Sequence, residues 1–292
     1  MPVRIPKRVA AIHDISGFGR CSLGVAIPIL SCMGVQVCAA PTAVLSTHTG
    51  GFEGFTFTDM TPSLPEYFAH WLSLDIAFDC IYSGFLGSHE QIDIIIDFID
   101  KSNCPMVAVD PVFADEGRLY STLDTSFIAH MRRLIGKAHI ITPNMTEAAF
   151  LLGETFCDTL DSGTAKQWLS RLGSMILPNG TVALTGLRLT DGADGTYGVG
   201  VYDGSSGGFW MAESTYIPVM YPGTGDIFAS VMIGAILDGF PPQEAAAKAC
   251  AFVQTAIAVT YGAGSIPTKE GVLLEAVLCE LKDMECSKFF EL

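Results

Sequence analysis

Short apolar runs alternate with longer amphipathic stretches along most of the chain. The apolar runs are rich in β-branched residues and cover residues 9–12, 35–38, 80–82, 106–109, 140–141 and 182–184. Strands that are apolar on both faces and alternate with helices are typical of βαβ units around a buried sheet. The pattern therefore predicts a three-layer α/β/α fold with a central, mostly parallel sheet.

Amphipathic stretches place the expected helices between and after these runs. They lie near residues 23–33, 63–74, 88–101, 124–137, 146–153, 163–174, 224–238, 243–260 and 270–283. Two segments break the alternation: residues 51–58 alternate phenylalanines with small or polar residues, and residues 197–211 read as strand, Gly-Ser-Ser-Gly-Gly turn and strand. We expect antiparallel additions there, at a sheet edge or as a flap. No repeat or long linker interrupts residues 1–292, so one domain is predicted.

Composition narrows the class of protein. The chain has 292 residues, 49% hydrophobic and 16% charged, so it can bury a large core. A formal net charge of −15 argues against nucleic acid or an anionic membrane as a partner, because both bind basic surfaces. The lack of a long apolar stretch and of a signal-peptide pattern predicts a soluble, cytoplasmic protein. The nine cysteines are scattered without a Cys-x-x-Cys pair, which favours reduced thiols over disulfides or a zinc site.

Polar residues follow five of the predicted strands. In an open parallel sheet, ligands bind beyond the carboxyl ends of the strands, so these residues are candidates for one shared site. Turns are also polar, and each ending alone fits that simpler explanation. Five endings together are more than turns require, and they are His13-Asp14-Ile15-Ser16, Ser83-Gly84-Phe85, Asp110-Pro111-Val112, Thr142-Pro143-Asn144 and Thr185-Gly186.

The run Gly223-Thr224-Gly225-Asp226 leads directly into an apolar helical pattern. Glycines let the backbone turn successive N–H groups toward one point, and a helix start adds a positive dipole end, so the run suits a bound phosphate. A carboxylate at Asp226 could accept the proton of a hydroxyl that attacks the γ-phosphorus. The alternative is an ordinary helix start in which Asp226 is a capping residue.

Asp110, Asp115, Asn144 and Glu147 form a second candidate group. Their oxygens suit Mg²⁺, usually bound through its waters, and this ion would offset the repulsion between ATP and an acidic protein. The Asn-x-x-Glu spacing fits equally well a capping pair at a helix start. His48, in the loop of residues 46–51, either contacts a ligand or satisfies its own loop.

Residues 17–22, Gly-Phe-Gly-Arg-Cys-Ser, are similar to the dinucleotide fingerprint Gly-x-Gly-x-x-Gly. Their last position is serine, however, and no acidic residue ends the next strand near Ala40. A Rossmann dehydrogenase is therefore not predicted.

The polar segments, in this order, resemble the ribokinase-like kinases, and within them the branch of pyridoxal kinases that includes the bacterial pyridoxamine kinases. The resemblance covers nearly the whole chain. Its most specific pieces are Leu45-Ser46-Thr47-His48-Thr49-Gly50, Tyr82-Ser83-Gly84-Phe85-Leu86-Gly87, Val109-Asp110-Pro111-Val112, Thr142-Pro143-Asn144-Met145-Thr146-Glu147 and Gly223-Thr224-Gly225-Asp226.

This resemblance implies transfer of the ATP γ-phosphoryl group to the 5′-hydroxymethyl of pyridoxal, pyridoxamine or pyridoxine. Mg²⁺ is the implied cofactor, K⁺ is a further candidate, and the family suggests a homodimer. The implied catalytic group is Asp226 as base with the amides of Gly223, Thr224 and Gly225 as anion hole. The implied ATP contacts are Asp110, Asn144, Glu147, Thr185 and Gly225, with Asp115, Thr142 and the 197–211 hairpin nearby, and Mg²⁺ on Asp110 and Glu147, partly through water. The implied substrate contacts are Asp14, Ser16, His48, Thr49 and Phe85.

Two positions depart from the pattern of the better-known pyridoxal kinases. Asp14 stands where they usually carry serine, and its carboxylate suggests a preference for the cationic amine of pyridoxamine. Phe85 replaces a frequent tyrosine, and its ring can still stack on a pyridine. Residues 17–22 also differ, which leaves the substrate loop less well defined.

Three other functions stay open. Hydroxymethylpyrimidine kinases of thiamine synthesis share the implied fold, but they generally have cysteine at the position of Asp226. A sugar kinase is less compatible with Phe52, Phe55 and Phe85 near the pocket. A non-catalytic binder of ATP or pyridoxal phosphate would be expected to have lost Asp226 or Glu147, and this chain keeps both.

Overall fold

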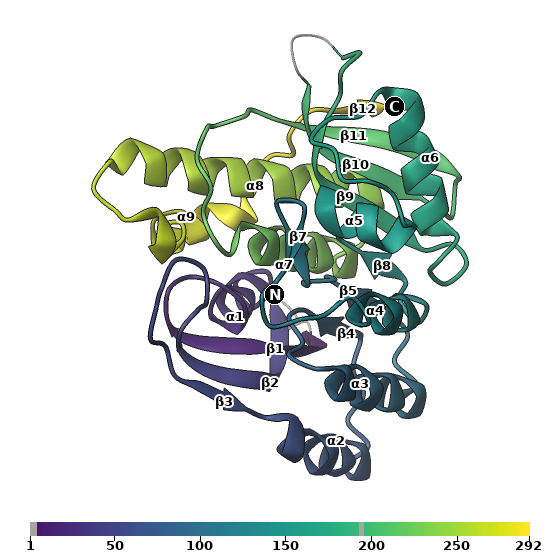
Figure 1. Ribbon diagram of the computed structural model, residues 1–292, viewed down its shortest axis with the longest axis vertical. Coiled ribbons are helices and arrows are strands. Elements are labelled where there is room, and N and C mark those ends of the chain that lie inside the picture. The colour runs from purple at the N-terminus through teal and green to yellow at the C-terminus, as the bar shows by residue number, and fades with distance from the viewer. Residues whose placement is uncertain (1–4, 193–195) are drawn as a thin grey trace.

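A ten-stranded sheet lies at the centre of the protein (Figure 1). The computed structural model describes residues 5–192 and 196–292. The strands of the sheet are β1 (Lys7–Phe18), β2 (Val35–Thr47), β3 (Phe57–Asp59), β4 (Cys80–Ser83), β5 (Val107–Val109), β8 (Ile140–Ile141), β9 (Thr181–Arg188), β10 (Tyr197–Asp203), β11 (Gly208–Ser214) and β12 (Phe289–Glu291). Two further strands, β6 (Ala114–Asp115) and β7 (Arg118–Leu119), form a separate hairpin.

The strand order is β12-β11-β10-β9-β8-β5-β4-β1-β2-β3. The pairs from β9 through β2 are parallel, whereas β3 at one edge and β10, β11 and β12 at the other are antiparallel. The predicted, mostly parallel sheet with antiparallel edge additions is therefore confirmed. Residues 51–58 lead into β3, and residues 197–211 form most of the β10–β11 hairpin.

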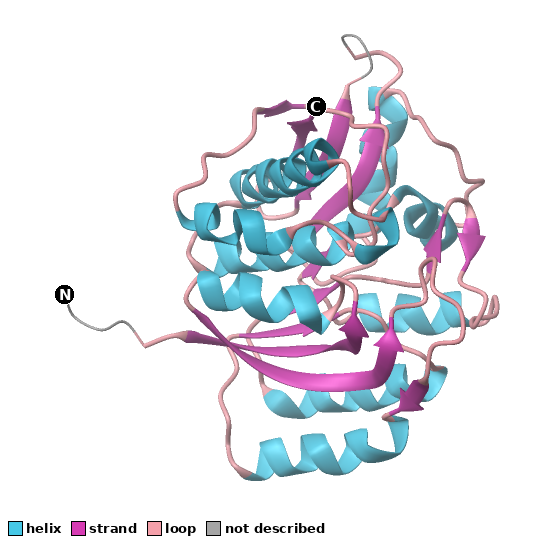
Figure 2. Ribbon diagram, turned by 90° about the vertical axis from the view of Figure 1, so that its left-hand side faces the viewer, coloured by secondary structure: helices cyan, strands magenta, loops and turns pink. Residues whose placement is uncertain are grey.

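Helices cover both faces of the sheet, as Figure 2 shows, which makes the predicted three layers. One layer contains α2 (Leu64–Ser73), α3 (His89–Ser102), α4 (Phe127–Ile135), α5 (Met145–Leu152) and α6 (Ser162–Gly173); the other contains α1 (Leu23–Cys32), α7 (Thr224–Leu237), α8 (Pro242–Ala263) and α9 (Leu274–Val277). Ala10 and Ile12 of β1 pack with the first layer, and Val9 and Ala11 pack with the second. Both faces of β1 are buried, as its continuous apolar run indicates.

Helix α7 is buried along most of its length. Every residue from Asp226 to Ala235 is buried, between the neighbouring helices α1 and α8. A helix that is apolar on all sides belongs in a protein interior. Asp226, in its first turn, is thus a buried carboxyl at the start of a mostly apolar helix.

The C-terminal region differs from the prediction. In place of one helix over residues 270–283, the chain forms three short pieces, Thr268–Glu270, Leu274–Val277 and Leu278–Lys282. Gly271 ends the first piece, because its φ of +79° is not helical, and a Cβ there would lie 2.9 Å from the backbone oxygen of Arg20. Strands β6 (Ala-Asp), β7 (Arg-Leu) and β12 (Phe-Phe-Glu) each include a charged residue and lack an uninterrupted apolar run, so the sequence pattern does not predict them.

All nine cysteines are free thiols, as their spacing predicts. Within residues 5–192 and 196–292, no helix combines the length and the apolar character needed to cross a bilayer.

Candidate active site

The glycine turn before α7 has the close backbone packing that its sequence suggests. Gly223 precedes the helix with a φ of +85°, and a Cβ there would lie 2.1 Å from the backbone oxygen of Arg20. Glycine is therefore required both by the turn and by the neighbouring backbone. Gly225, in contrast, is exposed, with open space around the position of a Cβ. The N–H groups of the first turn of α7 are the free donors that an anion can use.

Asp226 does not cap its own helix, so the simpler explanation of this residue is wrong. Its Oδ1 lies 2.9 Å from Nε2 of His13, and its Oδ2 accepts a 2.6 Å hydrogen bond from the amide of Ser22. The carboxylate is thus held by β1 and by the loop after it. About a tenth of the side chain, 11%, remains accessible to a reactant.

His13 links Asp226 to a second carboxylate. Its Nδ1 lies 2.8 Å from Oδ1 of Asp14, and Ser16 Oγ donates a 3.4 Å hydrogen bond to Oδ2 of Asp14. The register of β1 against β2 shifts between His13 and Ile15, and such bulges re-aim side chains beside active sites. His13 is one of the polar residues that follow the predicted strands, and the sequence alone assigns it no role. Its position directly after the buried run was the available signal.

The charges along this chain of side chains stabilise one another. Burial alone lowers the pKa of His13, but the carboxylates of Asp226 and Asp14 outweigh it and raise that pKa to about 10. Burial alone raises the pKa of Asp14, but its hydrogen bond and attraction to His13 outweigh it, and the pKa is lowered. Asp14, His13 and Asp226 therefore behave as one buried carboxylate–imidazolium–carboxylate unit.

Asp110 lies at the end of β5, where the sheet pattern predicts it. Thr142, after β8, donates a 2.8 Å hydrogen bond from Oγ1 to Oδ1 of Asp110. Burial and repulsion by Asp226 raise the pKa of Asp110 to about 7, and the bond from Thr142 and the charge of His13 offset this only in part. The bulge within β1, the ends of β5 and β8 and the start of α7 thus bring their polar residues to one place.

Asn144 and Glu147 form the capping pair that the sequence analysis kept as an alternative. Asn144 Oδ1 accepts the amide of Glu147 at 2.9 Å, and Glu147 Oε2 accepts the amide of Asn144 at 2.8 Å. The amide of Phe113 lies 3.3 Å from the other oxygen of Glu147. Burial, with Asp110 as the next cause, raises the pKa of Glu147 well above its usual range. A capping role at the start of α5 is therefore shown, and a ligand role would be additional.

Asp110 and Glu147 are the two carboxyls of this site with the chemistry to hold Mg²⁺. In the described part of the chain, no group of three or more His, Cys, Asp or Glu side chains is arranged to hold a metal ion. Asp110 and Glu147 are nevertheless buried carboxyls with raised pKa values, and a nearby cation would favour their ionised forms. Asp115 is exposed on β6, and its Oδ1 accepts the amide of Glu116.

The remaining predicted residues lie in the loop around His48, after β4 and on β9. His48 satisfies its own loop: Nδ1 accepts the amide of Gly50 at 3.0 Å, so Nε2 carries the proton and donates to the backbone oxygen of Lys269 at 2.7 Å. Thr49 is exposed beside it. Phe85 is half-buried after β4, with its amide 3.3 Å from Nδ1 of His13. Thr185 on β9 bridges to Asn144, and its Oγ1 donates to the backbone oxygen of Pro143.

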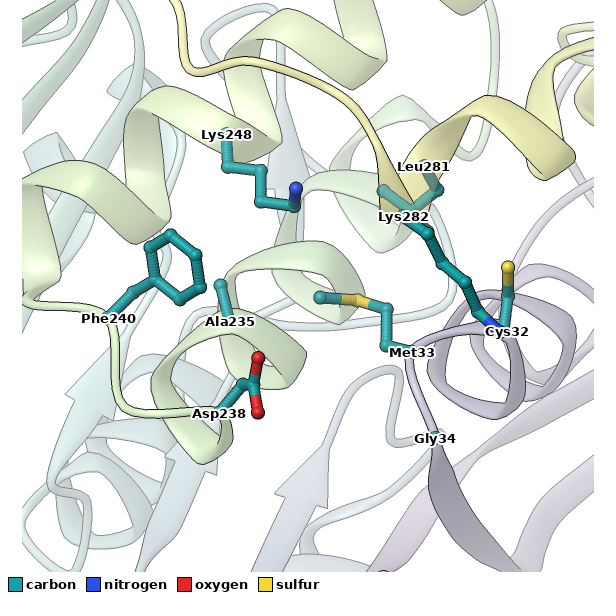
Figure 3. Close-up of a pocket in the computed structure, with 9 residues that line it drawn as sticks. All are labelled: Cys32, Met33, Gly34, Ala235, Asp238, Phe240, Lys248, Leu281 and Lys282. Atoms are coloured by element: carbon teal, nitrogen blue, oxygen red, sulfur yellow. The ribbon is translucent and has the colours of Figure 1, made fainter. Parts of the chain in front are cut away.

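A separate cavity of about 250 Å³ lies at the far end of α7 (Figure 3). Asp238, which follows α7, lines it together with Met33 and Lys248. Twelve residues of helix separate Asp226 from Asp238, or about 18 Å at 1.5 Å per residue. This cavity is therefore no part of the site around Asp226.

A family model described as phosphomethylpyrimidine kinase matches residues 27–269. The chain belongs to the phosphomethylpyrimidine kinase family. Among solved structures, this family member is similar to a protein of Bacteroides thetaiotaomicron VPI-5482, titled as a phosphomethylpyrimidine kinase and crystallised with pyridoxal, at 40% identity and a TM-score of 0.92 over 99% of this chain and 100% of that one. The pyridoxal kinase from Lactobacillus plantarum is 30% identical, with a TM-score of 0.87 over 96% of this chain and 98% of that one.

The sequence relatives likewise include both a thiamine biosynthesis protein and a pyridoxal kinase. The thiamine biosynthesis bifunctional protein ThiED of Geobacter sulfurreducens is 27% identical over 240 residues, which are 82% of this chain and 46% of that protein. The pyridoxal kinase PdxY of Granulibacter bethesdensis is 28% identical over 267 residues, which are 88% of this chain and 91% of that protein. The chain thus spans less than half of the first relative and nearly all of the second. The predicted resemblance to pyridoxal kinases is confirmed, and this family member is a kinase.

Proposed function

We propose that this kinase transfers the γ-phosphoryl group of ATP to the 5′-hydroxymethyl of a vitamin B6 pyridine, namely pyridoxal, pyridoxamine or pyridoxine. The observation that carries the proposal is Asp226, a buried carboxylate oriented by two hydrogen bonds at the start of a helix with free amides. The similarity to a protein crystallised with pyridoxal supports the choice of acceptor.

The proposed reaction assigns a step to each part of the site. As the substrate oxygen bonds to the γ-phosphorus, its proton passes to Asp226, the bond from that phosphorus to the bridging oxygen breaks, and ADP leaves. The amides of Gly223, Thr224 and Gly225 stabilise the charge on the transferred group. Asp110 and Glu147 would hold Mg²⁺ through its waters, and Mg²⁺ would supply positive charge to the phosphates. Thr185 and Asn144 border the place for ATP.

On the substrate side, Asp14, Ser16 and Phe85 are the proposed contacts for the pyridine. Phe85 offers a half-buried ring face. His48 has both ring nitrogens bonded to backbone groups, so its proposed role is to shape the loop that carries Thr49. Its ring edge is thereby fixed against Phe52, at 5.0 Å between centroids.

A hydroxymethylpyrimidine is the second candidate acceptor. The description of the matching family and the thiamine biosynthesis relative favour it. Against it, the resemblance associates cysteine, and not aspartate, with the base position of those kinases.

The test is ADP formation measured with pyridoxal, pyridoxamine, pyridoxine, hydroxymethylpyrimidine and ribose as acceptors, followed by identification of the phosphorylated product. We expect the highest kcat/KM with a B6 vitamer. Turnover with hydroxymethylpyrimidine alone would transfer the proposal to the second candidate. No turnover with any B6 vitamer would refute the first.

A further inference from the structure

His13 is enclosed by groups that leave room for an imidazole and little else. Only 1% of the residue is exposed. Gly84 lies so close that a Cβ there would be 1.9 Å from Cδ2 of the ring. Tyr82 packs edge-on against the same ring, at 6.4 Å between centroids. Position 84 must therefore be glycine, because any side chain there would overlap the ring that contacts Asp226.

The two carboxylate contacts of the ring favour a proton on each of its nitrogens. Nε2 faces Oδ1 of Asp226 at 2.9 Å, and Nδ1 faces Oδ1 of Asp14 at 2.8 Å. An ionised carboxylate only accepts hydrogen bonds, so each ring nitrogen must carry a proton to satisfy both contacts. The amides of Asp14 and Phe85 also approach Nδ1, at 2.9 and 3.3 Å. A neutral ring that accepted from them would leave a lone pair facing the carboxylate of Asp14.

The imidazolium of His13 is surrounded by negative charges that it can stabilise. Three buried carboxyls, Asp14, Asp110 and Asp226, act on His13, and the ring of Tyr82, which is also titratable, packs against it. Repulsion by Asp226 already disfavours the ionised form of Asp110. A base for phosphoryl transfer has to be both ionised and aimed, and His13 supplies a cation and a hydrogen bond for that.

We propose that His13 is a positioning residue of the kinase reaction: it holds Asp226 in the orientation of the base and keeps it ionised beside Asp110 and the phosphates. This inference rests on the proposed function, in which Asp226 accepts the proton of the substrate hydroxyl. It adds a residue to the site that acts through Asp226 and does not touch the substrate.

Two substitutions separate the hydrogen bond from the charge. His13→Gln keeps a neutral N–H donor near the position of Nε2, toward Asp226, whereas His13→Asn keeps one near Nδ1, toward Asp14. Removing a residue that orients a reactive group typically costs about 10- to 100-fold in activity. We expect kcat to fall by about that factor in His13→Asn and by less in His13→Gln, with smaller changes in KM for ATP.

The pH profile provides a readout that a merely structural role would not move. Both variants lack the cation, so the acid limb of the kcat profile should shift to higher pH in both, even where His13→Gln recovers rate. Parental kcat and an unshifted acid limb in folded His13→Gln and His13→Asn would overturn the inference.

A spectroscopic measurement on the unmodified protein tests the same point without any substrate. In histidine-¹⁵N NMR spectra at about pH 9, where an ordinary imidazole is neutral, we expect one histidine with both nitrogens protonated. Its absence would overturn the inference. If the protein phosphorylates no B6 vitamer, the proposed function fails, and the NMR spectrum still decides the protonation of His13. If it phosphorylates hydroxymethylpyrimidine instead, the kinetic test is run with that acceptor.

Discussion

The backbone amide of Ser22 lies 2.6 Å from Oδ2 of Asp226 and donates a hydrogen bond to it across 204 residues of sequence. The loop that carries Ser22 is itself held by Arg20, whose amide donates to the backbone oxygen of Glu270 at 3.1 Å. The backbone oxygen of Arg20 would collide with any side chain at position 223. Residues 20–22, the turn at Gly223 and residues 268–271 therefore form one packed unit.

Replacing the base tests the centre of the proposed mechanism. In Asp226→Asn we expect kcat to fall by about 10²- to 10⁴-fold, the usual contribution of a general base, with ATP binding largely kept. Steady-state kinetics with pyridoxal and ATP titration by calorimetry would measure both. Asp238→Asn, just after the far end of the same helix, is the matched control and should keep the parental rate. An Asp226→Asn protein with the parental rate would show that the base is elsewhere.

The two glycines of the anion hole should respond differently to alanine. Gly223→Ala introduces a Cβ at a φ of +85° and 2.1 Å from a backbone oxygen, so we expect a loss of at least about 2 kcal/mol in the free energy of unfolding. Gly225→Ala meets nothing within 4 Å and lies in a helix, so its free energy of unfolding should stay within about 1 kcal/mol of the parent. Urea unfolding of both variants checks this, and equal effects would contradict the packing described for Gly223.

The His13 unit predicts a dependence of stability on pH. Its folded pKa of about 10 lies above the ordinary 6.5, so its contribution is complete below about pH 6.5 and is lost as pH rises toward 10. The free energy of unfolding should fall by up to about 1.4 kcal/mol per pH unit in that window. The raised pKa values of the buried thiols also make the free energy of unfolding fall at high pH. The His13→Asn variant keeps these thiols, so the difference between its slope and that of the parent isolates the contribution of His13. Urea unfolding at several pH values should show a shallower slope for this variant; equal slopes would contradict the prediction.

We expect Asp110 to release a proton when magnesium and ATP bind. Its pKa of about 7 in the free protein means that it is largely protonated below that pH, and a bound cation favours the ionised form. Calorimetry near pH 6.5 in buffers of different ionisation enthalpy should detect the released proton. The release should decrease well above pH 7 and should be lost in Asp110→Asn. Release that is unchanged in that variant would assign the proton to another group.

Asp14 tests the preference for pyridoxamine. Its carboxylate is already paired with His13, yet Oδ2 also meets Ser16, at 3.4 Å, on the substrate side of the unit. We expect Asp14→Ser to lower the ratio of kcat/KM for pyridoxamine to that for pyridoxal, because it removes a negative charge near a cationic amine. An unchanged ratio would refute the preference, whatever happens to the absolute rates.

Local signals in the sequence predicted the layers of the fold and several of the polar residues that the structure brings together. The buried runs of β1, β4, β5, β8 and β9 are continuous, and Asp110 and Thr142 follow from the rule that strand ends face the ligand. The turn at Gly223 was visible because glycine spacing before an apolar helix is itself a local pattern. Each of these features depends on a few neighbouring residues.

The rest of the site depends on contacts that no local pattern contains. The pairing of Asp226 with His13 joins residues 213 positions apart, so the sequence could show a polar strand end but not its partner. For Asn144 and Glu147 the spacing allowed a cap or a ligand pair, and only the two reciprocal hydrogen bonds show the cap. The break at Gly271 likewise comes from Arg20, far away in the sequence.

The long sequence separation within the Asp226 cluster has a consequence for synthesis of the chain. Strand β1 is synthesised first, but the carboxylate of Asp226, which contacts His13 on that strand, is made only after three quarters of the 292 residues. A nascent chain therefore lacks the main counter-charge of His13 until α7 has been made and has docked. Contacts between such distant segments are slow to form. Enzymatic activity thus reports completion of the whole molecule and not of any early folding unit.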